Sequence, residues 1–344
     1  MEPDVSAIIV SYADPAATRA TIESLLAQQL APLEVVVVDN HPDAPLAALL
    51  GELPAGVRLL EPVGNAGYVR ACNRAAAQAR GSWVWFLNPD ATADPQCLRE
   101  LCAAGEPDDV AVVGAQVLLP GWERVNAGDN PIHLTGLCWS GRFEEAREHG
   151  APRDVAAVSG AALMVRRSAF ETLGGFEPSY FMYQDDTDIC WRARLAGWRV
   201  RFVPEAVVEH DYTFEKGSSK WYWLERNRWW TVLSNYELRT LLLLTPLLLA
   251  AEAGIVALSL RDGWWREKLR SWASLARGAR ALRRHRSSVQ ALRAVGDERL
   301  LQQMTARLDT PLFASPLARR VGPLLDAYRC GVLAALRGSR RGAR

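Results

Sequence analysis

The sequence lacks most of the features by which secreted, zinc-dependent and dinucleotide-binding proteins are identified. Its six cysteines form no C-x-x-C pair, and no histidine cluster has zinc-ligand spacing, so we expect free, mostly buried thiols in a reducing compartment. The first residues lack the basic and apolar stretches of a signal peptide, which predicts a cytosolic protein. No G-x-G-x-x-G motif follows the first apolar run, which argues against a dinucleotide-binding fold.

The chain has 344 residues, of which 49% are apolar and 23% are charged. These values are typical of globular proteins and exclude a disordered chain, a coiled coil and a collagen-like repeat. The formal net charge of +1 conceals a division, because residues 1–235 carry −11 and residues 236–344 carry +12. An acidic first part and a basic second part indicate two regions with different partners. We therefore expect a domain boundary after residue 235.

Short apolar runs alternate with helical patterns along the first part of the chain. Near-continuous apolar strands that alternate with helices predict an α/β fold, with a mostly parallel sheet covered on both faces. The segment 121–150 interrupts this pattern with charged residues and glycines, and we expect a loop-rich insert there. The expected strands are 5–11, 33–38, 57–60, 83–87, 110–118, 155–165 and 200–203, and the expected helices are 17–29, 46–50, 69–79, 94–104, 168–173 and 188–196.

Polar residues follow several predicted strands at their carboxyl ends, where ligands gather in parallel sheets. Asp39 follows the second strand, and Asn88 and Asp90 flank Pro89 after the fourth. The small residues of 64–67 (Gly-Asn-Ala-Gly) let the backbone approach a ligand closely. Each signal has a simpler interpretation, because a strand-end aspartate often caps a helix or forms a turn. Together, these groups are the ones that a nucleotide and a metal ion need.

Three carboxylates, Asp185, Asp186 and Asp188, lie within four residues of one another. Their mutual repulsion has to be offset by a cation, a proton or a helix N-terminus. Two interpretations stay open: Asp186 or Thr187 caps the following helix, or one carboxylate acts as a general base toward a substrate hydroxyl. His210 follows a short apolar run and is either structural or a metal ligand. Oxygen donors together with one imidazole suit Mg²⁺ or Mn²⁺.

The motifs follow one another in a specific order: 5–11, Asp39-Asn40, 64–67, 87–90 (Leu-Asn-Pro-Asp), 159–162, 174–176, the acidic turn at 185–188, and His210. This ordered set resembles the family 2 glycosyltransferases, and it is most similar to the rhamnosyltransferase-like branch of bacterial cell-surface polysaccharide assembly. The resemblance extends over residues 4–235. It implies for residues 1–235 the GT-A fold, a nucleotide-sugar-binding, mostly parallel sheet flanked by helices. For residues 236–344 we expect a helical, basic, membrane-associating region.

The resemblance assigns the polar strand ends to donor and metal binding. The donor's pyrimidine is expected at Asp39. The other expected donor contacts are Ser11, Tyr12, Asn65, Gly67, Asn88, Lys216 and Arg226. A divalent cation, Mg²⁺ or Mn²⁺, is expected at Asp90 and His210, with Asn88 as a third ligand. Asn88 replaces the first aspartate of the family's metal motif, and because an amide oxygen is a weaker ligand than a carboxylate, metal affinity stays open.

The reaction that the resemblance implies is a single in-line displacement that inverts the anomeric centre. Asp186 would take the proton of an acceptor hydroxyl, and Asp185 is the alternative base. The hydroxyl would replace the nucleoside diphosphate through an oxocarbenium-like transition state. The expected partners are a nucleoside-diphosphate sugar, with rhamnose as one candidate sugar, and a glycan or lipid-linked acceptor.

Two other functions fit parts of the sequence. A sugar-nucleotide nucleotidyltransferase should carry a glycine-rich, Arg- or Lys-bearing phosphate loop after the first strand, where this chain has Ser-Tyr-Ala-Asp-Pro at 11–15. A catalytically inactive, membrane-associated scaffold would have been favoured by loss of Asp90, Asp186 or His210, and all three are present. Both functions therefore rank below a glycosyltransferase.

Residues 241–260 form a leucine-rich stretch of the length of a transmembrane helix. Glu252 near its centre and Pro246 disfavour a span. The tryptophans at 264–265 and an arginine-rich run follow, which is typical of a segment lying in an anionic membrane surface. A buried core or dimer helix and a true span are the alternatives, and no stacking aromatics indicate nucleic-acid binding. The expected location is cytoplasmic, peripheral on the inner face of the cell membrane, with a homodimer left open.

Overall fold

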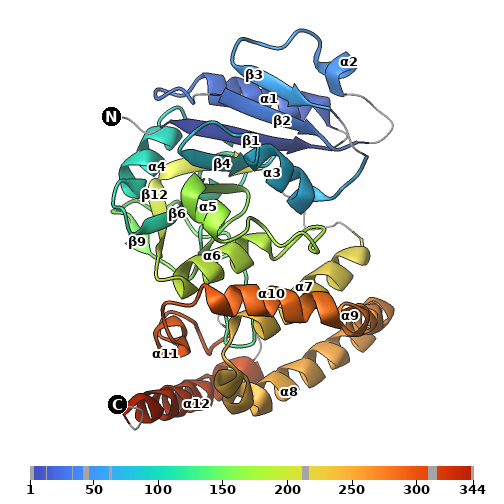
Figure 1. Ribbon diagram of the computed structural model, residues 1–344, viewed down its shortest axis with the longest axis vertical. Helices are drawn as coiled ribbons and strands as arrows, with labels where there is room; N and C mark the ends of the chain where they lie inside the picture. The colour runs from blue at the N-terminus through green and yellow to red at the C-terminus, as the bar shows by residue number, and fades with distance from the viewer. Residues whose placement is uncertain are drawn as a thin grey trace. The chain divides into compact units, whose positions relative to one another are not determined.

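The computed structural model describes residues 4–12, 14–32, 34–41, 46–61, 64–210, 217–308 and 316–341, and its contacts divide the chain into two compact units (Figure 1). The first unit comprises Met1–Asn130, Ser140–Ala193 and Trp198–Thr213, and the second comprises Pro131–Trp139, Arg194–Gly197 and Phe214–Arg344. The helix over residues 219–235 belongs to the second unit, although the charge boundary placed it in the first domain.

A sheet of ten strands among the described residues forms the centre of the first unit. The strands of this unit are β1 (Val5–Ser11), β2 (Glu34–Asp39), β3 (Val57–Leu60), β4 (Trp83–Leu87), β5 (Ala91–Ala93), β6 (Val110–Leu118), β7 (Val125–Ala127), β8 (Asp129–Asn130), β9 (Arg153–Asp154), β10 (Ala157–Val158), β11 (Ala162–Arg166) and β12 (Arg199–His210). The main order is β3-β2-β1-β4-β11-β6-β12-β5, while β7 pairs with β6 and β9 pairs with β12. β8 and β10 form a separate two-stranded sheet. The α/β fold expected from the sequence is confirmed.

Parallel pairing brings the carboxyl ends of β1, β2 and β4 to one edge of the sheet. Ser11 lies beside Asp39 in the β1–β2 register, and Ile9 lies beside Leu87 in the β1–β4 register. Asn88 follows Leu87 directly, so it leaves the sheet at the same edge as Asp39. The polar strand ends that the sequence singled out are therefore neighbours in space.

Helices cover both faces of this sheet (Figure 1). They are α1 (Pro15–Leu26), α2 (Leu46–Leu50), α3 (Tyr68–Ala76), α4 (Cys97–Gly105), α5 (Arg167–Thr172) and α6 (Asp185–Leu195). On one face, Ile22 of α1 and Leu98 of α4 join buried strand residues in one apolar cluster. On the other face, the ring of Phe86 in β4 lies 5.4 Å from that of Phe170 and 4.9 Å from that of Phe176. Because both faces are buried, β1, β2, β4 and β6 are mostly apolar instead of alternating.

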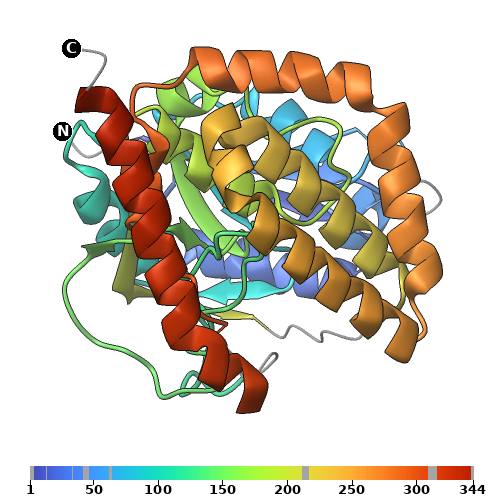
Figure 2. The ribbon, with the colours of Figure 1, turned by 90° about the horizontal axis from the view of Figure 1, so that it is seen from below.

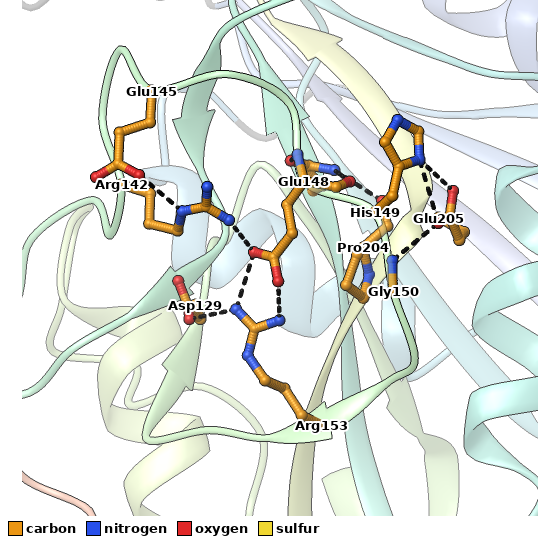
Figure 3. A network of polar contacts seen from close by, with 10 residues as sticks. Asp129, Arg142, Glu145, Glu148, His149, Gly150, Arg153, Pro204 and Glu205 are labelled. Atoms are coloured by element: carbon orange, nitrogen blue, oxygen red, sulfur yellow. Dashed lines mark hydrogen bonds and ion pairs between the residues drawn. The ribbon is translucent and has the colours of Figure 1, made fainter.

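Charged side chains order the segment that the sequence predicted as a loop-rich insert (Figure 3). Arg153 contacts Asp129 at 2.6 Å and Glu148 at 2.5 Å, and Arg142 contacts the same Glu148 at 2.5 Å. Gln116 of β6 donates to the carbonyl of Glu148 at 2.9 Å and accepts from its backbone N–H at 2.7 Å. These contacts attach this part of the insert to the sheet.

The single strand expected over residues 155–165 is instead two strands, β10 and β11, separated by a turn. The backbone N–H of Ala162 donates to the carbonyl of Ser159 at 3.3 Å, which closes this turn. The expectation was wrong because Ser159 and Gly160 interrupt the apolar run. The turn places the backbone N–H of Gly160 against the acidic segment at 185–188.

The second unit contains the helical C-terminal region expected from the sequence (Figure 2). Its helices are α7 (Ser219–Asn235), α8 (Leu238–Arg261), α9 (Trp265–Arg277), α10 (Ala279–Ala291), α11 (Asp297–Leu301) and α12 (Pro316–Arg341). α7 packs against α9 and α10, and α8 packs against α9 and α12. The buried Tyr236 hydroxyl donates to the carbonyl of Leu134 at 2.9 Å, which holds the segment 131–139 in this unit.

Buried charges join α7, α8 and α9. Glu225 pairs with Arg228 at 2.7 Å and with Lys268. Glu252 of α8 pairs with the same two cations, at 2.8 Å from Arg228 and 2.6 Å from Lys268. Among the described residues, α8 is the one helix long and apolar enough to cross a membrane by length and composition. Its acidic residue is therefore neutralised by neighbouring helices of the same unit.

Candidate active site

The carboxylate of Asp39 is buried at the end of β2 and orders the backbone that follows it. Its Oδ2 accepts a hydrogen bond from the N–H of Leu46 at 2.7 Å, and its Oδ1 accepts one from the N–H of His41 at 3.1 Å. Leu46 is the first residue of α2, so the simpler interpretation of a strand-end aspartate, a helix cap, applies to Asp39. Each carboxylate oxygen has a second lone pair, so these bonds leave acceptor capacity for a ligand.

Ser11 and Tyr12, the two residues predicted at the end of β1, differ in whether their side chains are available to bind a ligand. The hydroxyl of Ser11 is buried and shares a hydrogen bond of 2.7 Å with the hydroxyl of Thr18 in α1. The side chain of Tyr12 is 51% exposed, and its ring centroid lies 5.0 Å from that of His41. An exposed aromatic ring at this edge is suited to stack on a planar base, whereas the Ser11 side chain serves the fold.

Amide side chains shape the loop at 64–67. Asn40 accepts from the N–H of Ala66 at 3.1 Å through its Oδ1, and its Nδ2 donates to Oδ1 of Asn65 at 3.4 Å. Oδ1 of Asn65 also accepts from the N–H of Gly67 at 3.1 Å. Gly67 has a φ of 83°, and a Cβ there would lie 2.5 Å from the ring of Phe181. Only glycine fits this position, because it combines a left-handed backbone with close contact to another segment.

Asn88, Asp90 and His210 converge beside β5. His210 at the end of β12 pairs with Ala91 in the antiparallel register, which places it next to Asp90. Nε2 of His210 lies 2.9 Å from Oδ1 of Asp90 and 3.3 Å from Nδ2 of Asn88. The imidazole is buried, and the Asp90 side chain is 37% exposed. The carbonyl of Pro89 accepts a hydrogen bond from Thr21 at 2.9 Å, which fixes the turn between the two strand-end side chains.

This group has a carboxylate, an imidazole and an amide, a donor set that suits Mn²⁺ or Mg²⁺. No cluster of three or more His, Cys, Asp or Glu side chains that could hold a metal occurs in the described part of the chain. A cation bound at Asp90 and His210 would therefore take its remaining ligands from an amide, water or substrate oxygens. The observed pair fits a metal that is held jointly by protein and substrate.

Asp186 is held by backbone donors on two sides. Its Oδ2 accepts from the N–H of Gly160 at 2.9 Å, and its Oδ1 accepts from the N–H of Thr187 at 2.6 Å. Burial raises the pKa of this carboxyl, and the hydrogen bonds from Gly160 and Thr187 partly offset that rise. The residue lies in the first turn of α6 and stays partly exposed. It combines a fixed orientation with access to solvent, as a general base requires.

The carboxyl groups of Asp185 and Asp188 lie in environments that differ from that of Asp186 and from one another. Burial and the charges of Asp186 and Asp188 raise the pKa of Asp185 to about 8, which favours its protonated form. Asp188 is fully buried and forms an ion pair of 2.8 Å with Arg192, one helical turn later. Arg192 also donates to the carbonyls of Leu173 and Gly175. An arginine thus offsets the charge of Asp188, and burial favours the protonated form of the other two carboxyls of the cluster.

Strained backbone precedes this cluster. Tyr183 and Gln184 have φ values of 66° and 67°. These values lie in the left-handed region, which residues other than glycine, asparagine and aspartate rarely adopt. Two consecutive residues in this region lead directly into Asp185 and α6. Strain of this kind persists only where the surroundings enforce it, and it is concentrated at functional sites.

Two of the predicted donor contacts are cations, Lys216 and Arg226. Lys216 lies outside the described residues. Arg226 belongs to α7 of the second unit, where it is buried, donates to Oδ1 of Asn227 at 2.8 Å and lies 4.4 Å from the ring centre of Trp230.

Two residues that shape the site were not predicted as part of it. Gly160 supplies the N–H to Asp186, and Asn40 connects β2 with the loop at 64–67. The signal for Asn40 was its position directly after Asp39 at the strand end. For Gly160 the signals were its place in the motif at 159–162 and a glycine inside an apolar run, which indicates a bend but not its partner.

Comparison with known proteins agrees with this architecture. Residues 3–231 match the family model described as glycosyltransferase like family 2. The N-acetylglucosaminyl-diphospho-decaprenol L-rhamnosyltransferase of Mycobacterium tuberculosis is 28% identical over 327 residues, covering 83% of this chain and 94% of that protein. The O-antigen biosynthesis protein RfbC of Myxococcus xanthus is 31% identical over 221 residues, covering 60% of this chain and 17% of that protein.

A solved structure shows the same fold. The crystal structure of GalNAc-T7 with UDP, GalNAc and Mn²⁺ aligns with a TM-score of 0.57 at 16% identity, covering 67% of this chain and 48% of that chain. This similarity confirms the GT-A arrangement that the sequence resemblance implied. By its family match and its fold, the chain belongs to the glycosyltransferase like family 2, in the branch that resembles rhamnosyltransferases, and is a glycosyltransferase.

Proposed function

We propose that this enzyme transfers a sugar, with rhamnose as the first candidate, from a nucleoside diphosphate to a hydroxyl of a lipid-linked glycan acceptor, with inversion. The observation that carries this proposal is the placement of Asp186, whose carboxylate is oriented by the N–H of Gly160 at the end of the sheet. The relative that covers most of this chain is named for a lipid-diphosphate acceptor and for rhamnose, which supports both substrate classes. The reaction would serve cell-surface polysaccharide assembly.

Asp186 is the proposed general base. In its ionised form it accepts the proton of the acceptor hydroxyl while that oxygen attacks the anomeric carbon, and the bond to the diphosphate breaks on the opposite face. A positioned base of this kind contributes about 10²–10⁴-fold to the rate. Asp185 is less suited to this role, because its side chain is buried whereas Asp186 is partly exposed. No second carboxylate nucleophile is needed for a single displacement.

The donor nucleotide is proposed to bind at the carboxyl ends of β1 and β2. Asp39 would accept a hydrogen bond from the base with the lone pairs that the backbone amides leave open. Tyr12 would stack on the base, and Asn65 and Gly67 would line the donor from the loop at 64–67. The backbone of Ser11, Asn88 and the cations Lys216 and Arg226 complete the proposed donor contacts.

A divalent cation, Mg²⁺ or Mn²⁺, is proposed at Asp90 and His210, with Asn88 as an additional ligand. When bound, the cation would neutralise charge on the donor diphosphate and on the leaving nucleoside diphosphate. The protein's own part is to hold the carboxylate and the imidazole 2.9 Å apart, in the geometry set by the pairing of β12 with β5.

The two parts of the chain are proposed to have different roles, catalysis and membrane attachment. Residues 1–235 would form the catalytic domain, in agreement with the family match to residues 3–231. Residues 236–344 would form a basic helical region that keeps the enzyme in the cytoplasm on the inner, anionic face of the cell membrane, where lipid-linked acceptors are available. A homodimer is compatible with this arrangement.

The test is transfer from a panel of nucleoside-diphosphate sugars to an acceptor with a lipid-linked N-acetylglucosamine, comparing wild type with Asp186→Asn. The variant should lose at least about 10²-fold in kcat while its donor affinity changes little, since only the proton transfer is lost. Asp108→Asn, on an exposed loop, is the matched control and should behave as wild type. Equal losses of donor affinity and kcat would instead make Asp186 a binding residue. Release of pyrophosphate from a nucleoside triphosphate and a sugar 1-phosphate, assayed in parallel, would indicate a nucleotidyltransferase.

A further inference from the structure

Helix α8 has the reverse of the usual amphipathic arrangement. Its buried side chains include Thr240 and Ser259 along with Leu244 and Leu248. Its exposed side chains form an outer stripe, defined here as Leu238, Leu242, Pro246, Leu249, Ala253 and Leu260, which recur at helical spacing. The four leucines of this stripe are 61–67% exposed. A surface helix of a soluble protein places its apolar stripe inward, so this stripe requires another covering.

Between its terminal arginines, Glu252 and Thr245 of α8 make their hydrogen bonds on the inner side or within the helix. Glu252, the one charged residue between Arg239 and Arg261, accepts from the indole N–H of Trp272 at 2.6 Å and of Trp229 at 3.0 Å. It also pairs with two cations of neighbouring helices, as described above. The hydroxyl of Thr245, which is exposed, donates to the carbonyl of Leu241 at 2.9 Å within the helix. The outer stripe therefore carries no charge.

Helix α9 packs against α8 and carries an apolar stripe of its own. Trp265, Leu269 and Trp272 recur at spacings of four and three residues and are 40%, 49% and 38% exposed. The Trp272 ring has its N–H on Glu252 and its remaining surface partly in solvent, an arrangement that suits an interface between water and lipid. Partly exposed tryptophans at the edge of an apolar helix are typical of membrane-interface segments.

The charge around these stripes matches an anionic surface. Residues 236–344 carry a net charge of +12, and several of these cations are exposed on α9 and α10, among them Arg266, Arg277, Arg280 and Arg283. Two copies of such a basic region repel one another, whereas an anionic bilayer attracts each of them. The charge therefore favours lipid over a second copy of the chain as the covering of the outer stripe.

The contacts of Glu252 also decide between an in-plane helix and a span. At 24 residues, α8 is long enough to cross a bilayer, at roughly 36 Å. A spanning position would carry Glu252, Arg228 and Lys268 into the hydrocarbon together, because these side chains bind one another across three helices. Ionisable groups are costly at that depth. An in-plane position keeps this network in the protein and places only the outer stripe in lipid.

We infer that the outer stripe of α8, together with Trp265, Leu269 and Trp272 of α9, is a docking surface that lies in the plane of an anionic membrane. This inference deepens the proposed function, on which it rests, because it assigns the surface by which the enzyme meets a lipid-linked acceptor. The occupant is the bilayer surface itself, and no transmembrane passage is involved.

The experiment is co-sedimentation of the full-length protein with preformed vesicles of phosphatidylcholine, with and without phosphatidylglycerol. The wild type should bind the phosphatidylglycerol vesicles and be released only partly by high salt, since apolar insertion is not screened. The double variant Leu242→Glu/Leu249→Glu should bind at least 10-fold more weakly. The uncharged pair Leu242→Ser/Leu249→Ser should show an intermediate loss. Leu26→Glu, at an exposed leucine of the first unit, is the matched control and should bind as wild type.

Donor hydrolysis in solution, measured without vesicles, separates loss of docking from loss of folding, and it should be unchanged in the double variants. Undiminished vesicle binding by both double variants would overturn the inference. The inference would also be overturned if the wild type did not bind vesicles but was a dimer by light scattering, and if both double variants were monomers. Vesicle binding that behaves as expected, in a protein that turns over no nucleoside-diphosphate sugar, would remove the proposed function while leaving the docking surface in place.

Discussion

The backbone N–H of Gly160 donates a 2.9 Å hydrogen bond to Oδ2 of Asp186, and the α-carbon of this glycine lies so close that a Cβ would sit 3.2 Å from Cβ of the aspartate. The turn between β10 and β11 thus sets both the orientation and the clearance of the proposed base. A residue with no side chain is therefore one of the structural determinants of the site.

Gly160→Ala should test this relationship. The added methyl group has to displace Asp186 by a few tenths of an ångström, and we expect kcat to fall about 10-fold with a smaller change in donor KM, since misplacement of a catalytic group is costly. Gly331→Ala, where a Cβ meets nothing within 4 Å, is the control. An unchanged kcat in steady-state assays would mean that the reaction tolerates movement of Asp186.

The raised pKa of Asp185 predicts a pH dependence of stability. Between its ordinary value of 3.8 and its folded value of about 8, the folded protein binds more protons at this site than the unfolded chain does. The free energy of unfolding should therefore fall as pH rises through this window, by about 1.4 kcal/mol for each unit of pKa shift at most. Asp185→Asn should flatten this dependence and be more stable than wild type at pH 8, as measured by urea unfolding from pH 4 to pH 8. A slope that persists in the variant would assign it to another group.

The buried pairs of α7 predict the opposite behaviour in acid. Burial alone would raise the pKa of Glu225, but Arg228 and Lys268 outweigh it and lower this pKa to about 2. This group therefore stabilises the fold above its ordinary value of 4.5, and the contribution is lost as pH falls from 4.5 toward 2. Glu225→Gln should cost about 3 kcal/mol in unfolding free energy at neutral pH, because it leaves buried cations short of a partner. Glu267→Gln, which breaks a pair with the largely exposed Arg270, should cost less than about 1 kcal/mol.

Removal of a proposed metal ligand should weaken nucleotide binding only when a divalent cation is present. We expect His210→Ala and Asp90→Ala each to lower Mn²⁺-dependent affinity for a nucleoside diphosphate at least about 10-fold in titration calorimetry. His149→Ala, at a histidine whose side chain is 66% exposed, is the control. If the wild type bound the nucleotide equally well in Mn²⁺ and in EDTA, the metal role of Asp90 and His210 would be excluded.

The strand ends were predictable from sequence because local patterns determine them. A buried parallel strand is mostly apolar, so a polar residue at its carboxyl end marks the edge of the sheet, as Asp39 and Asn88 do. The pairing of His210 with Asp90 followed only from the family resemblance, because it depends on the register of β12 and β5, which lie more than a hundred residues apart. The helical tail was predictable from composition, but the direction in which Glu252 points was not.

Partners of polar side chains were the least predictable feature. Asp188 is part of the same acidic run as Asp186, yet it forms a buried pair with Arg192 and serves the fold. Ser11 ends β1, but its hydroxyl is bonded to Thr18 inside the molecule. In both cases the partner lies on a helix whose rotation about its axis is set by tertiary packing. Sequence patterns identify which residues have side chains that could bind a ligand or transfer a proton. Packing determines which of these side chains are not already bonded within the fold.

The contact between Gly67 and Phe181 restricts how this enzyme can be re-engineered. A side chain at position 67 would collide with both the ring and the carbonyl oxygen of Phe181, so a smaller residue at 181 would relieve only part of the clash. A library that randomises residues 64–67 should therefore recover glycine at 67 in nearly every active clone. Tyr12 and Asn65, which are exposed, offer the freedom that position 67 lacks. In the proposed donor site, new donor preferences should be sought at these two side chains.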